Sequence, residues 1–487
     1  MWITIDRENR LPLARQLYNQ IRQMILSGAL ESGHKLPSTR RLSSELSLSR
    51  NTIIEAYSQL IAEGYLKTHE GSGTMVSEGL RVLDIPRPRA LNPAPNQNSI
   101  PPAERIIDFR TGVPALEFFP RKEWGSLYRD IIGKIPASRL SYCDASGVWE
   151  LREAIAQYLY RARGLSCDPA QIIVTSGSTQ GLSIVSYALK DYDKVVITED
   201  PSHSGLRKVI TMAGTLTEGI PVDDRGLRTE FLNAKKNVSF IYTTPSHQYP
   251  MGGILPVQRR LELIHYAEQN DCYIVEDDYD SEFRYEGQPV SSLWELDPQR
   301  VIYLGSFSKI LAPALRLGFM ILPRKLLHLC KKQKMYSDVH SDSPGQYVLA
   351  RFIKDGGFEK HIWRMKKHYT RNRGLILGEL SKRFPNQFDV LGHATGLHLV
   401  AQFHNRVFTK KTINEIAENG ARVYRIGSFY LNEKQSDNNK IILGYSHLSH
   451  NEIARGIEII SRVLGRPPTF TESPRRLASN RRTSGSF

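Results

Sequence analysis

The sequence has little cysteine and no long hydrophobic run. Only four cysteines occur among its 487 residues, and their spacing matches no metal site; they stand at positions 143, 167, 272 and 330. We therefore expect reduced thiols in a cytoplasmic protein, without a disulfide framework or a bound metal. A membrane helix needs roughly 18 apolar residues in a row, and no segment comes near that length. Residues 1–10 also carry charges where a signal peptide needs an apolar core, so we expect no membrane partner.

Acidic residues are outnumbered by basic ones. Lysine and arginine total 65, aspartate and glutamate total 50, and the net charge is +15. A surplus of this size favours an acidic partner such as nucleic acid, although charge alone does not name the partner. At 487 residues the chain is also too long for one ordinary domain. We therefore expect two or three domains.

Two segments lack a regular apolar pattern and divide the chain. Residues 78–105 are rich in proline and asparagine, which predicts an extended, flexible linker. Residues 466–487 contain five arginines and one glutamate, which predicts a basic, disordered tail. These boundaries leave a compact unit at residues 1–77 and a larger domain at residues 106–465.

The first unit contains two short helices in succession. Ser38 and Ser49 are each placed to cap the start of a helix. An apolar face with helical spacing follows Ser49 and consists of Ile53, Ala56, Tyr57, Leu60 and Ile61. The outer face at the start of this second helix carries Arg50, Asn51 and Thr52, which are suited to base edges and phosphates in a major groove. Two strands around a Gly-Ser-Gly turn then predict a wing.

Pairs of short helices with solvated arginines are common, so the pattern alone leaves a plain helical domain open. The stretch "LPSTRRLSSELSLSRNTIIEAYSQLIAEGYL", followed by "GSGTMV", resembles the winged helix-turn-helix of the GntR family over nearly the whole unit. The resemblance implies that this unit binds double-stranded DNA. It implies DNA contacts at Arg40, Ser49, Arg50, Asn51 and the wing residue Gly71.

The larger domain alternates apolar, strand-like runs with helical patterns. The runs include "QIIVTSG", "KVVITED", "VSFIYTTP", "CYIVEDD" and "RVIYLGS". This order predicts an α/β fold with a mainly parallel sheet covered by helices. Each run ends in polar or glycine residues, and open α/β sheets place their ligands at those strand ends.

Three of the strand ends carry the parts of a pyridoxal phosphate site. Lys309 follows an apolar run and can link to an aldehyde through its amine. Asp277 can keep a pyridine nitrogen protonated. Ser178 and Thr179 lie at a strand-to-helix turn that favours a phosphate, and Arg316 adds a rigid fork for the phosphate oxygens. A single lysine here would more often be a solvated surface residue, and it is the combination that predicts the site.

The phrases "TPSHQYPMGG", "EDDYDSEFRY" and "SFSKILAPALRLGF" resemble those of a known family. From about residue 106 to 465 the chain resembles fold-type I, class I aminotransferases, which have a large and a small subdomain. The two units together resemble the MocR subfamily of GntR regulators. The resemblance implies a bound pyridoxal 5'-phosphate held by Lys309 at its aldehyde, Asp277 at the ring nitrogen, Tyr279 at the ring hydroxyl, and Ser178, Thr179, Ser306 and Arg316 at the phosphate.

The same resemblance bears on the oligomeric state. Tyr142, in "SYCDASG", matches a tyrosine that reaches the phosphate from a second subunit. That role exists only if two chains meet at the site, so the resemblance implies a homodimer.

The chain departs from the aminotransferase pattern around the ring and at the substrate. His203 stands where family members often have a tyrosine stacked on the ring, and its neutral imidazole can still stack there and contact the cofactor. Residues 249–252 replace an Asn-Pro-x-Gly motif near the ring hydroxyl. Aminotransferases grip the substrate carboxylate with an arginine in a late strand, and Ile441 and Ile442 occupy that place here. Two nearby polar residues are candidate ligand contacts: Arg425 and Ser428.

Two functions remain open. The first is a transcription regulator whose aminotransferase-like domain senses pyridoxal phosphate or an amino compound and biases two subunits on an operator with two half-sites. The second is a working aminotransferase with an accessory DNA-binding domain. The missing arginine favours the first, because a transaminase must hold the substrate carboxylate while the reacting bond is oriented against the ring. The sequence names neither the effector nor the target genes.

Overall fold

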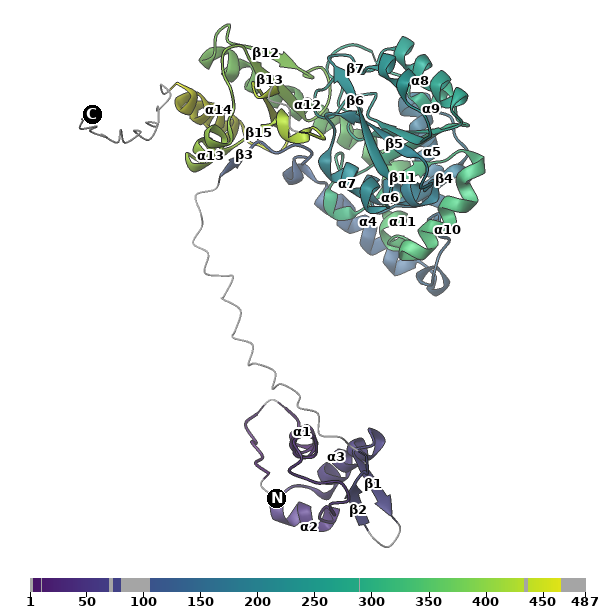
Figure 1. Cartoon of the computed structure of the whole chain (residues 1–487), viewed down its shortest axis with the longest axis vertical. Coiled ribbons are helices and arrows are strands. Elements are labelled where there is room, and N and C mark those ends of the chain that lie inside the picture. The colour runs from purple at the N-terminus through teal and green to yellow at the C-terminus, as the bar shows by residue number, and fades with distance from the viewer. Residues whose placement is uncertain are drawn as a thin grey trace, which may run out of the picture. The chain divides into compact units, whose positions relative to one another are not determined.

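The computed structural model of the chain describes residues 3–9, 11–69, 73–79, 106–288, 290–432 and 437–465. The chain divides into two compact units, Met1–Pro101 and Pro102–Phe487 (Figure 1). The predicted linker lies outside the described residues apart from residues 78 and 79, and the predicted tail lies wholly outside them. No helix within the described ranges is long and apolar enough to cross a membrane.

The smaller unit consists of three helices and a two-stranded antiparallel sheet. Its elements are α1 (Leu13–Leu26), α2 (Thr39–Leu46), α3 (Arg50–Ala62), β1 (Leu66–His69) and β2 (Gly73–Val76). Apolar side chains that recur at helical spacing meet in one core, in which Leu17, Ile21, Ile53 and Leu60 are fully buried. The predicted helix-turn-helix followed by two strands is confirmed.

Both helices of the helix-turn-helix begin at a serine cap, as predicted. The Ser38 hydroxyl accepts a hydrogen bond from the Arg41 backbone N–H at 3.3 Å. The Ser49 hydroxyl accepts one from the Thr52 N–H at 3.1 Å. The predicted inner face of the second helix was wrong at one position. Ile61 is 38% exposed, because it lies at the edge of the buried stripe in the last turn of α3.

The larger unit is built on an eight-stranded sheet in the order β4-β11-β10-β9-β8-β5-β6-β7. The strands are β4 (Ile172–Thr175), β5 (Val195–Asp200), β6 (Leu216–Asp223), β7 (Gly226–Leu227), β8 (Val238–Thr243), β9 (Tyr273–Asp278), β10 (Val301–Ser306) and β11 (Gly318–Ile321). Strands β10, β9, β8, β5 and β6 pair in parallel. The predicted mainly parallel sheet is confirmed, with antiparallel pairing at β4–β11–β10 and β6–β7 that the sequence analysis did not foresee.

Helices cover both faces of this sheet. In the central strand β10, Ile302 and Leu304 pack into one core, and Val301 and Tyr303 pack into another. Helices α6, α7 and α10 contribute to the first core, and α5, α8 and α11 to the second. The helices of this unit up to residue 383 are α4 (Arg121–Lys134), α5 (Trp149–Arg163), α6 (Ser178–Ala188), α7 (Ser204–Met212), α8 (Val257–Gln269), α9 (Leu293–Leu296), α10 (Leu327–Asp338), α11 (Ser343–Lys354) and α12 (Gly357–Arg383).

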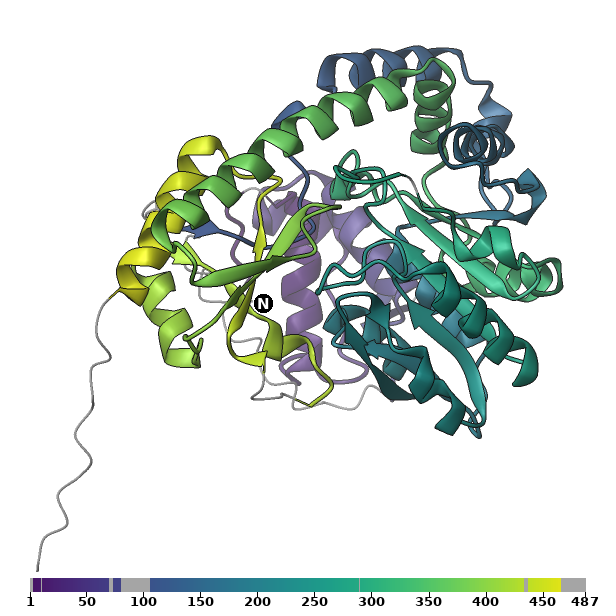
Figure 2. The ribbon, with the colours of Figure 1, turned by 90° about the horizontal axis from the view of Figure 1, so that it is seen from above.

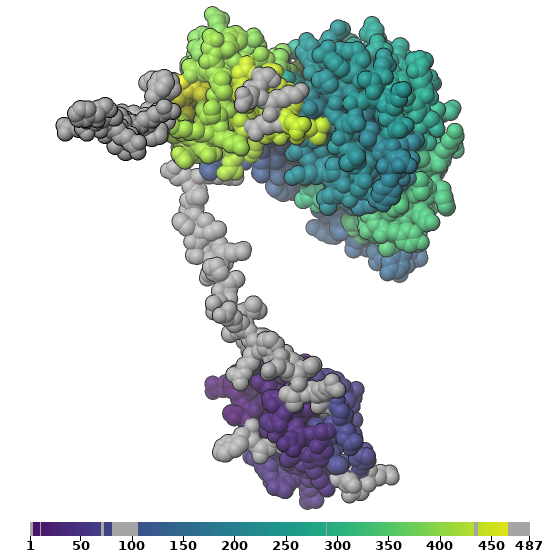
Figure 3. Space-filling view, viewed as in Figure 1, coloured from purple at the N-terminus to yellow at the C-terminus, as the bar shows by residue number. Residues whose placement is uncertain are grey.

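A second, smaller lobe follows the long helix α12, which runs along both lobes (Figure 2). Its antiparallel sheet has the order β12-β13-β16-β15, with β12 (Phe388–Leu391), β13 (His398–Phe403), β16 (Lys440–Gly444) and β15 (Tyr424–Arg425). Helices α13 (Lys410–Glu418) and α14 (His450–Leu464) accompany it, and β3 (Ile107–Asp108) pairs in parallel with β14 (Ala421–Arg422). The two lobes form one continuous surface (Figure 3), so residues of both can meet at one site.

Candidate functional site

The first candidate surface is the start of α3. Arg50 and Asn51 are exposed and Thr52 is half-buried. The Ser49 hydroxyl caps the helix and also shares a 2.8 Å hydrogen bond with the Thr52 hydroxyl. The cap therefore fixes the direction of the first turn, from which Arg50 and Asn51 project. An exposed helix start with these side chains is suited to entering a major groove.

A second cation of the same unit lies on α2. Arg40 is exposed and forms no ion pair among the described residues, whereas its neighbour Arg41 is held by Glu45 at 2.7 Å. Arg40 is therefore free to contact a phosphate oxygen. The predicted wing contact Gly71 lies outside the described residues.

The second candidate site is a pocket in the larger unit with a volume of about 220 Å³. It lies where β4, β9 and β10 end, which is the edge of the sheet that open α/β folds use for ligands. The structure brings eight of the predicted cofactor residues together along its walls: Lys309, Asp277, Tyr279, Ser178, Thr179, His203, Ser306 and Arg316. Residues of the smaller lobe, such as His398 on β13, complete the lining.

The amine of Lys309 lies in this pocket, close to a backbone carbonyl. Its Nζ donates to the carbonyl of Gly112 at 2.8 Å. Gly112 has a φ of +73°, and a Cβ at this position would come within 2.8 Å of Nζ, so the approach requires glycine. Burial lowers the pKa of Lys309 from its ordinary value, opposed by the negative charges of Asp280 and Asp277. The amine thus reaches its neutral, nucleophilic form at a lower pH than a solvated lysine does.

Asp277 lies at the end of β9 and is only half satisfied. Its Oδ2 accepts a hydrogen bond from the Tyr242 hydroxyl at 2.7 Å. Its buried Oδ1 has no hydrogen bond of normal geometry among the described residues, although the nearby Ser178 hydroxyl also lowers the pKa of this carboxyl. Burial raises the pKa of Asp277 to about 6, against the opposing effects of the Tyr242 hydrogen bond and the Lys309 charge. A cationic N–H group in the pocket would satisfy Oδ1 and stabilise the ionised carboxylate.

An anion site lies where α6 begins. Gly177 has a φ of +100°, and α6 starts at Ser178 without a side-chain cap in the described structure. A Cβ on Gly177 would lie 3.3 Å from Nη2 of Arg316, so this guanidinium lies against the start of the helix. Three predicted hydroxyl residues also line the pocket: Ser178, Thr179 and Ser306. Open N–H groups at a helix start, a guanidinium and hydroxyls together favour a phosphate.

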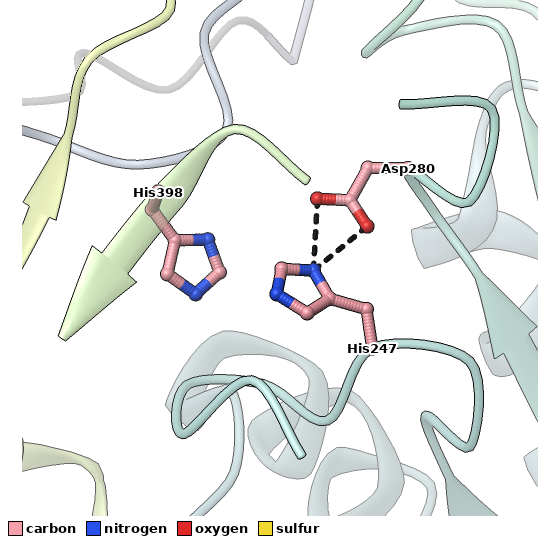
Figure 4. A group of neighbouring side chains, drawn as sticks. All are labelled: His247, Asp280 and His398. Carbon is pink, nitrogen blue, oxygen red and sulfur yellow. Dashed lines mark hydrogen bonds and ion pairs between the residues drawn. The ribbon is translucent and has the colours of Figure 1, made fainter. Parts of the chain in front are cut away.

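The sequence analysis missed a buried pair, His247 and Asp280, which Figure 4 shows and which contacts Tyr279 through His247. Nδ1 of His247 lies 3.0 and 3.1 Å from the two carboxylate oxygens of Asp280 and 2.9 Å from the Tyr279 hydroxyl. A single hydrogen on Nδ1 is best placed toward the carboxylate, which leaves the Tyr279 hydroxyl free to donate into the pocket. The backbone passes so close that a Cβ on Gly396 would lie 2.2 Å from Cε1 of His247.

His398 completes this cluster from the smaller lobe. Its ring centroid lies 4.9 Å from that of His247, and its Nε2 donates to the Pro250 carbonyl at 3.1 Å. Burial and the neighbouring His247 hold the pKa of His398 well below its ordinary value, so the ring is neutral. Ligand atoms of His247, Asp280 and His398 lie within 4.8 Å of one another, a spacing that can hold a metal ion. Hydrogen bonds already use one nitrogen of each ring, and we assign the cluster to positioning.

Of two further predicted residues, His203 lines the pocket and Tyr142 does not. His203 lines it, and its Nδ1 accepts the Leu206 backbone N–H at 3.2 Å. Burial lowers the pKa of His203, so the pocket meets a neutral imidazole. Tyr142 does not line the pocket of its own chain; it is 84% exposed and contacts the edge of the His340 ring.

The strand β16, where the sequence analysis expected but did not find an arginine, is apolar near the pocket. Ile442 is fully buried on β16 and packs in one cluster with Tyr249, Met251, Val400 and Ile426. Tyr249 belongs to this cluster and also lines the pocket. None of the predicted residues of this region lines the pocket directly: Ile441, Ile442, Arg425 and Ser428. An apolar wall can hold the body of a ligand but offers no charge to a carboxylate.

Comparison with known families matches both units. The family "Aminotransferase class I and II" matches residues 128–460, and "Bacterial regulatory proteins, gntR family" matches residues 13–76. The chain is 34% identical to the uncharacterized HTH-type transcriptional regulator YhdI of Bacillus subtilis, over 93% of this chain and 96% of that protein. It is 32% identical to the probable rhizopine catabolism regulatory protein MocR of Rhizobium meliloti, over 82% and 84% of the two chains.

A further relative and two solved structures agree. The pyridoxine biosynthesis transcriptional regulator PdxR of Corynebacterium glutamicum is 33% identical over 78% of this chain and 82% of its own. Kynurenine aminotransferase of Pyrococcus horikoshii matches with a TM-score of 0.69 at 27% identity, over 75% of this chain and 91% of that chain. An archaeal alanine:glyoxylate aminotransferase matches with a TM-score of 0.68 at 30% identity, over 74% and 90%. The matched structures are enzymes, whereas these full-length relatives are regulators.

Proposed function

Because the chain belongs to the MocR subfamily of GntR-type transcriptional regulators, we propose that its larger domain binds pyridoxal 5'-phosphate and senses a small molecule for the DNA-binding unit. The effector in this proposal is an amino compound or the cofactor itself. One relative is named for pyridoxine biosynthesis, which supports the cofactor as a candidate effector. The residues of the site favour binding of an amine but do not favour its efficient turnover.

One observation carries the cofactor assignment. The unpartnered, buried Oδ1 of Asp277 belongs to the same pocket as the amine of Lys309 and the open start of α6. These three features fit the ring nitrogen, the aldehyde and the phosphate of pyridoxal phosphate. When bound, the cofactor supplies an aldehyde that reacts with amines and a ring that withdraws electrons.

Each side chain of the pocket would have a separate role in binding the cofactor. Lys309 offers a partly neutral amine, which exchange with an incoming amine would release toward the Gly112 carbonyl. Asp277 would hold a proton on the ring nitrogen, and Tyr279, positioned by His247, would donate to the ring hydroxyl. Arg316 and the hydroxyls at α6 would bind the phosphate.

The same geometry disfavours rapid transamination. Catalysis requires the substrate to be held while its Cα–H bond is oriented against the ring. Ile442 gives the carboxylate no partner at the position where aminotransferases use arginine. An amino compound can then bind and remain poorly oriented for proton transfer. The intact Lys309 and Asp277 favour the alternative, an active aminotransferase with an accessory DNA-binding domain, and turnover assays separate the two.

We propose that two chains act together on DNA. Tyr142 is exposed on its own chain and available to reach the phosphate site of a second subunit. In a homodimer, two helix-turn-helix units would read two half-sites of an operator through α3, with Arg50, Asn51 and Thr52 toward the bases. Arg40, Ser49 and the wing residue Gly71 would contact the backbone.

Borohydride reduction tests the cofactor assignment. The purified protein should be yellow, and reduction should fix the cofactor to a single peptide containing Lys309. Lys309→Ala should lose the visible band and the covalent label, while Lys325→Ala, an exposed lysine outside the pocket, should keep both. A Lys309→Ala protein that retains the band and the label would refute the assignment.

A further inference from the structure

A second, larger cavity lies next to the cofactor pocket. Its volume is about 310 Å³, and its walls come from α5, α12 and the chain around Ser246, Ser281 and Thr395. Ser246 and Ser281 are the sequence neighbours of His247 and Asp280, the pair that contacts Tyr279 through His247. Asp280 lines the cofactor pocket and Ser281 lines the second cavity, so adjacent residues of one chain segment face the two cavities.

Several residues that line this second cavity carry an unpartnered polar atom. Four lining residues have a buried side-chain atom without a hydrogen-bond partner among the described residues: Ser246 Oγ, Thr395 Oγ1, Arg284 Nε and Glu359 Oε2. Ser246 is 6% exposed and Thr395 is 2% exposed, so neither hydroxyl lies at the surface. Leaving such groups unsatisfied is costly. Their occurrence in the wall of one cavity favours a polar guest.

The charges of the lining favour an anion. Two of its charged residues are already paired: Arg163 with Asp278, and Glu359 with Arg161. Arg284 is half-buried and Lys366 is exposed, and neither residue is in an ion pair within the described part of the chain. The remaining acid, Glu282, has its pKa raised to about 7 by burial, so it carries only part of a negative charge at neutral pH. Two cations are thus left to balance a guest.

The rest of the wall is apolar. Tyr158, Ile362, Trp363 and Val290 line the cavity beside the polar groups. An aliphatic or aromatic body can pack against these side chains while a charged head meets the guanidinium and the hydroxyls. Inorganic phosphate would leave this apolar wall uncovered, so an organic anion fits better.

We propose that this cavity is a second ligand site, which takes a small organic carboxylate with an apolar body. The carboxylate would accept hydrogen bonds from Arg284, Ser246 and Thr395, and the body would lie against Trp363. Through the chain segments that carry His247 and Asp280, the guest would also alter the surroundings of Tyr279. The site requires neither bound cofactor nor DNA, so its test is independent of the proposed function.

Tryptophan fluorescence of the full chain tests the site, with phenylacetate as the probe. The titration is made with and without added pyridoxal phosphate, because binding in the second cavity should be the same in both. We expect a saturable change in emission that Trp363→Phe abolishes. Phenylacetamide has the same shape without the charge, and we expect it to bind at least about tenfold more weakly. Equal binding of the amide, or a signal that persists in Trp363→Phe, would overturn the proposal.

Two variants and one control test whether the carboxylate of phenylacetate binds at Arg284 and Thr395. Arg284→Gln and Thr395→Val should each weaken phenylacetate binding, by about tenfold or more for Arg284→Gln and about threefold or more for Thr395→Val. Arg371→Gln is the matched control, since Arg371 is exposed on α12 and does not line the cavity. Thr395→Val keeps the shape of the residue and guards against a folding defect in Arg284→Gln. Wild-type affinity in both variants, or no saturable binding by the wild-type protein, would show that the cavity holds only solvent.

Discussion

Single residues of the cofactor pocket are tuned by burial more than by charge. Asp277 shows this most clearly, because desolvation raises its pKa to about 6 despite the hydrogen bond from Tyr242. In the cofactor-free protein the carboxyl is therefore largely protonated below about pH 6. A protonated carboxyl has no negative charge with which to attract a protonated ring nitrogen.

The affinity for pyridoxal phosphate should therefore fall as the pH drops through 6. Binding to the ionised carboxylate must displace its proton in that range, which weakens affinity by at most about tenfold per pH unit. Above pH 6 this contribution should be flat. Fluorescence titrations from pH 5 to 8 measure it, with Asp277→Asn as the control that binds weakly and lacks this dependence. Parallel pH profiles for the wild-type protein and Asp277→Asn would contradict the role of Asp277.

The sequence alone was enough to identify site residues that directly follow a strand. Lys309 and Asp277 each follow an apolar run, and neighbouring parallel strands bring those ends to one edge of the sheet. His247 and His398 could not be placed in this way, because they lie about 150 positions apart and meet only when the smaller lobe packs on the larger one. The quoted phrase "TPSHQYPMGG" contained His247, but nothing in its spacing indicated a partner at Asp280.

Helix α3 is the element that we propose contacts the DNA bases. Arg50→Ala should weaken binding to the specific operator by about 1–3 kcal/mol if Arg50 contacts a base edge. If Arg50 contacts only phosphate, affinity should fall for all sequences alike and the salt slope should flatten by roughly one unit. Gel-shift titrations at several salt concentrations distinguish the two results. Arg15→Ala on α1 is the control in the same unit, and unchanged binding by Arg50→Ala would remove Arg50 from the surface.

Elements were easier to predict than the directions of their pairing. The serine caps and apolar stripes of α2 and α3 are local signals, and the structure has both caps. Strand β11 is fully buried and apolar, so its composition resembles that of a parallel strand. Its antiparallel pairing follows from the connection at residues 307–317, which is too short for a crossover helix. The edge position of β4 beyond β11 depends on packing across the whole sheet and left no local signal.

At the scale of the whole molecule, the account requires two chains. Light scattering of the cofactor-loaded protein should give twice the chain mass of 55.4 kDa. Tyr142→Phe should keep that mass but lose pyridoxal phosphate faster on dialysis, because it lacks the phenol proposed to reach the second subunit's phosphate. Tyr192→Phe, also highly exposed, serves as the control. A monomer that retains its cofactor fully would contradict the shared site.

The central claim is that binding of a small molecule in the larger domain changes DNA binding without efficient turnover. It is tested most directly by titrating the DNA upstream of this protein's own coding region with cofactor-loaded protein, with and without each of a panel of amines plus 2-oxoglutarate. Keto acid is assayed in the same samples to measure turnover. DNA affinity of cofactor-free protein, with and without pyridoxal phosphate alone, tests the cofactor as effector. The account predicts a severalfold change in DNA affinity with one effector and turnover far below about 1 per second. Unchanged DNA affinity together with steady turnover at about 1 per second or faster would contradict it and establish the aminotransferase.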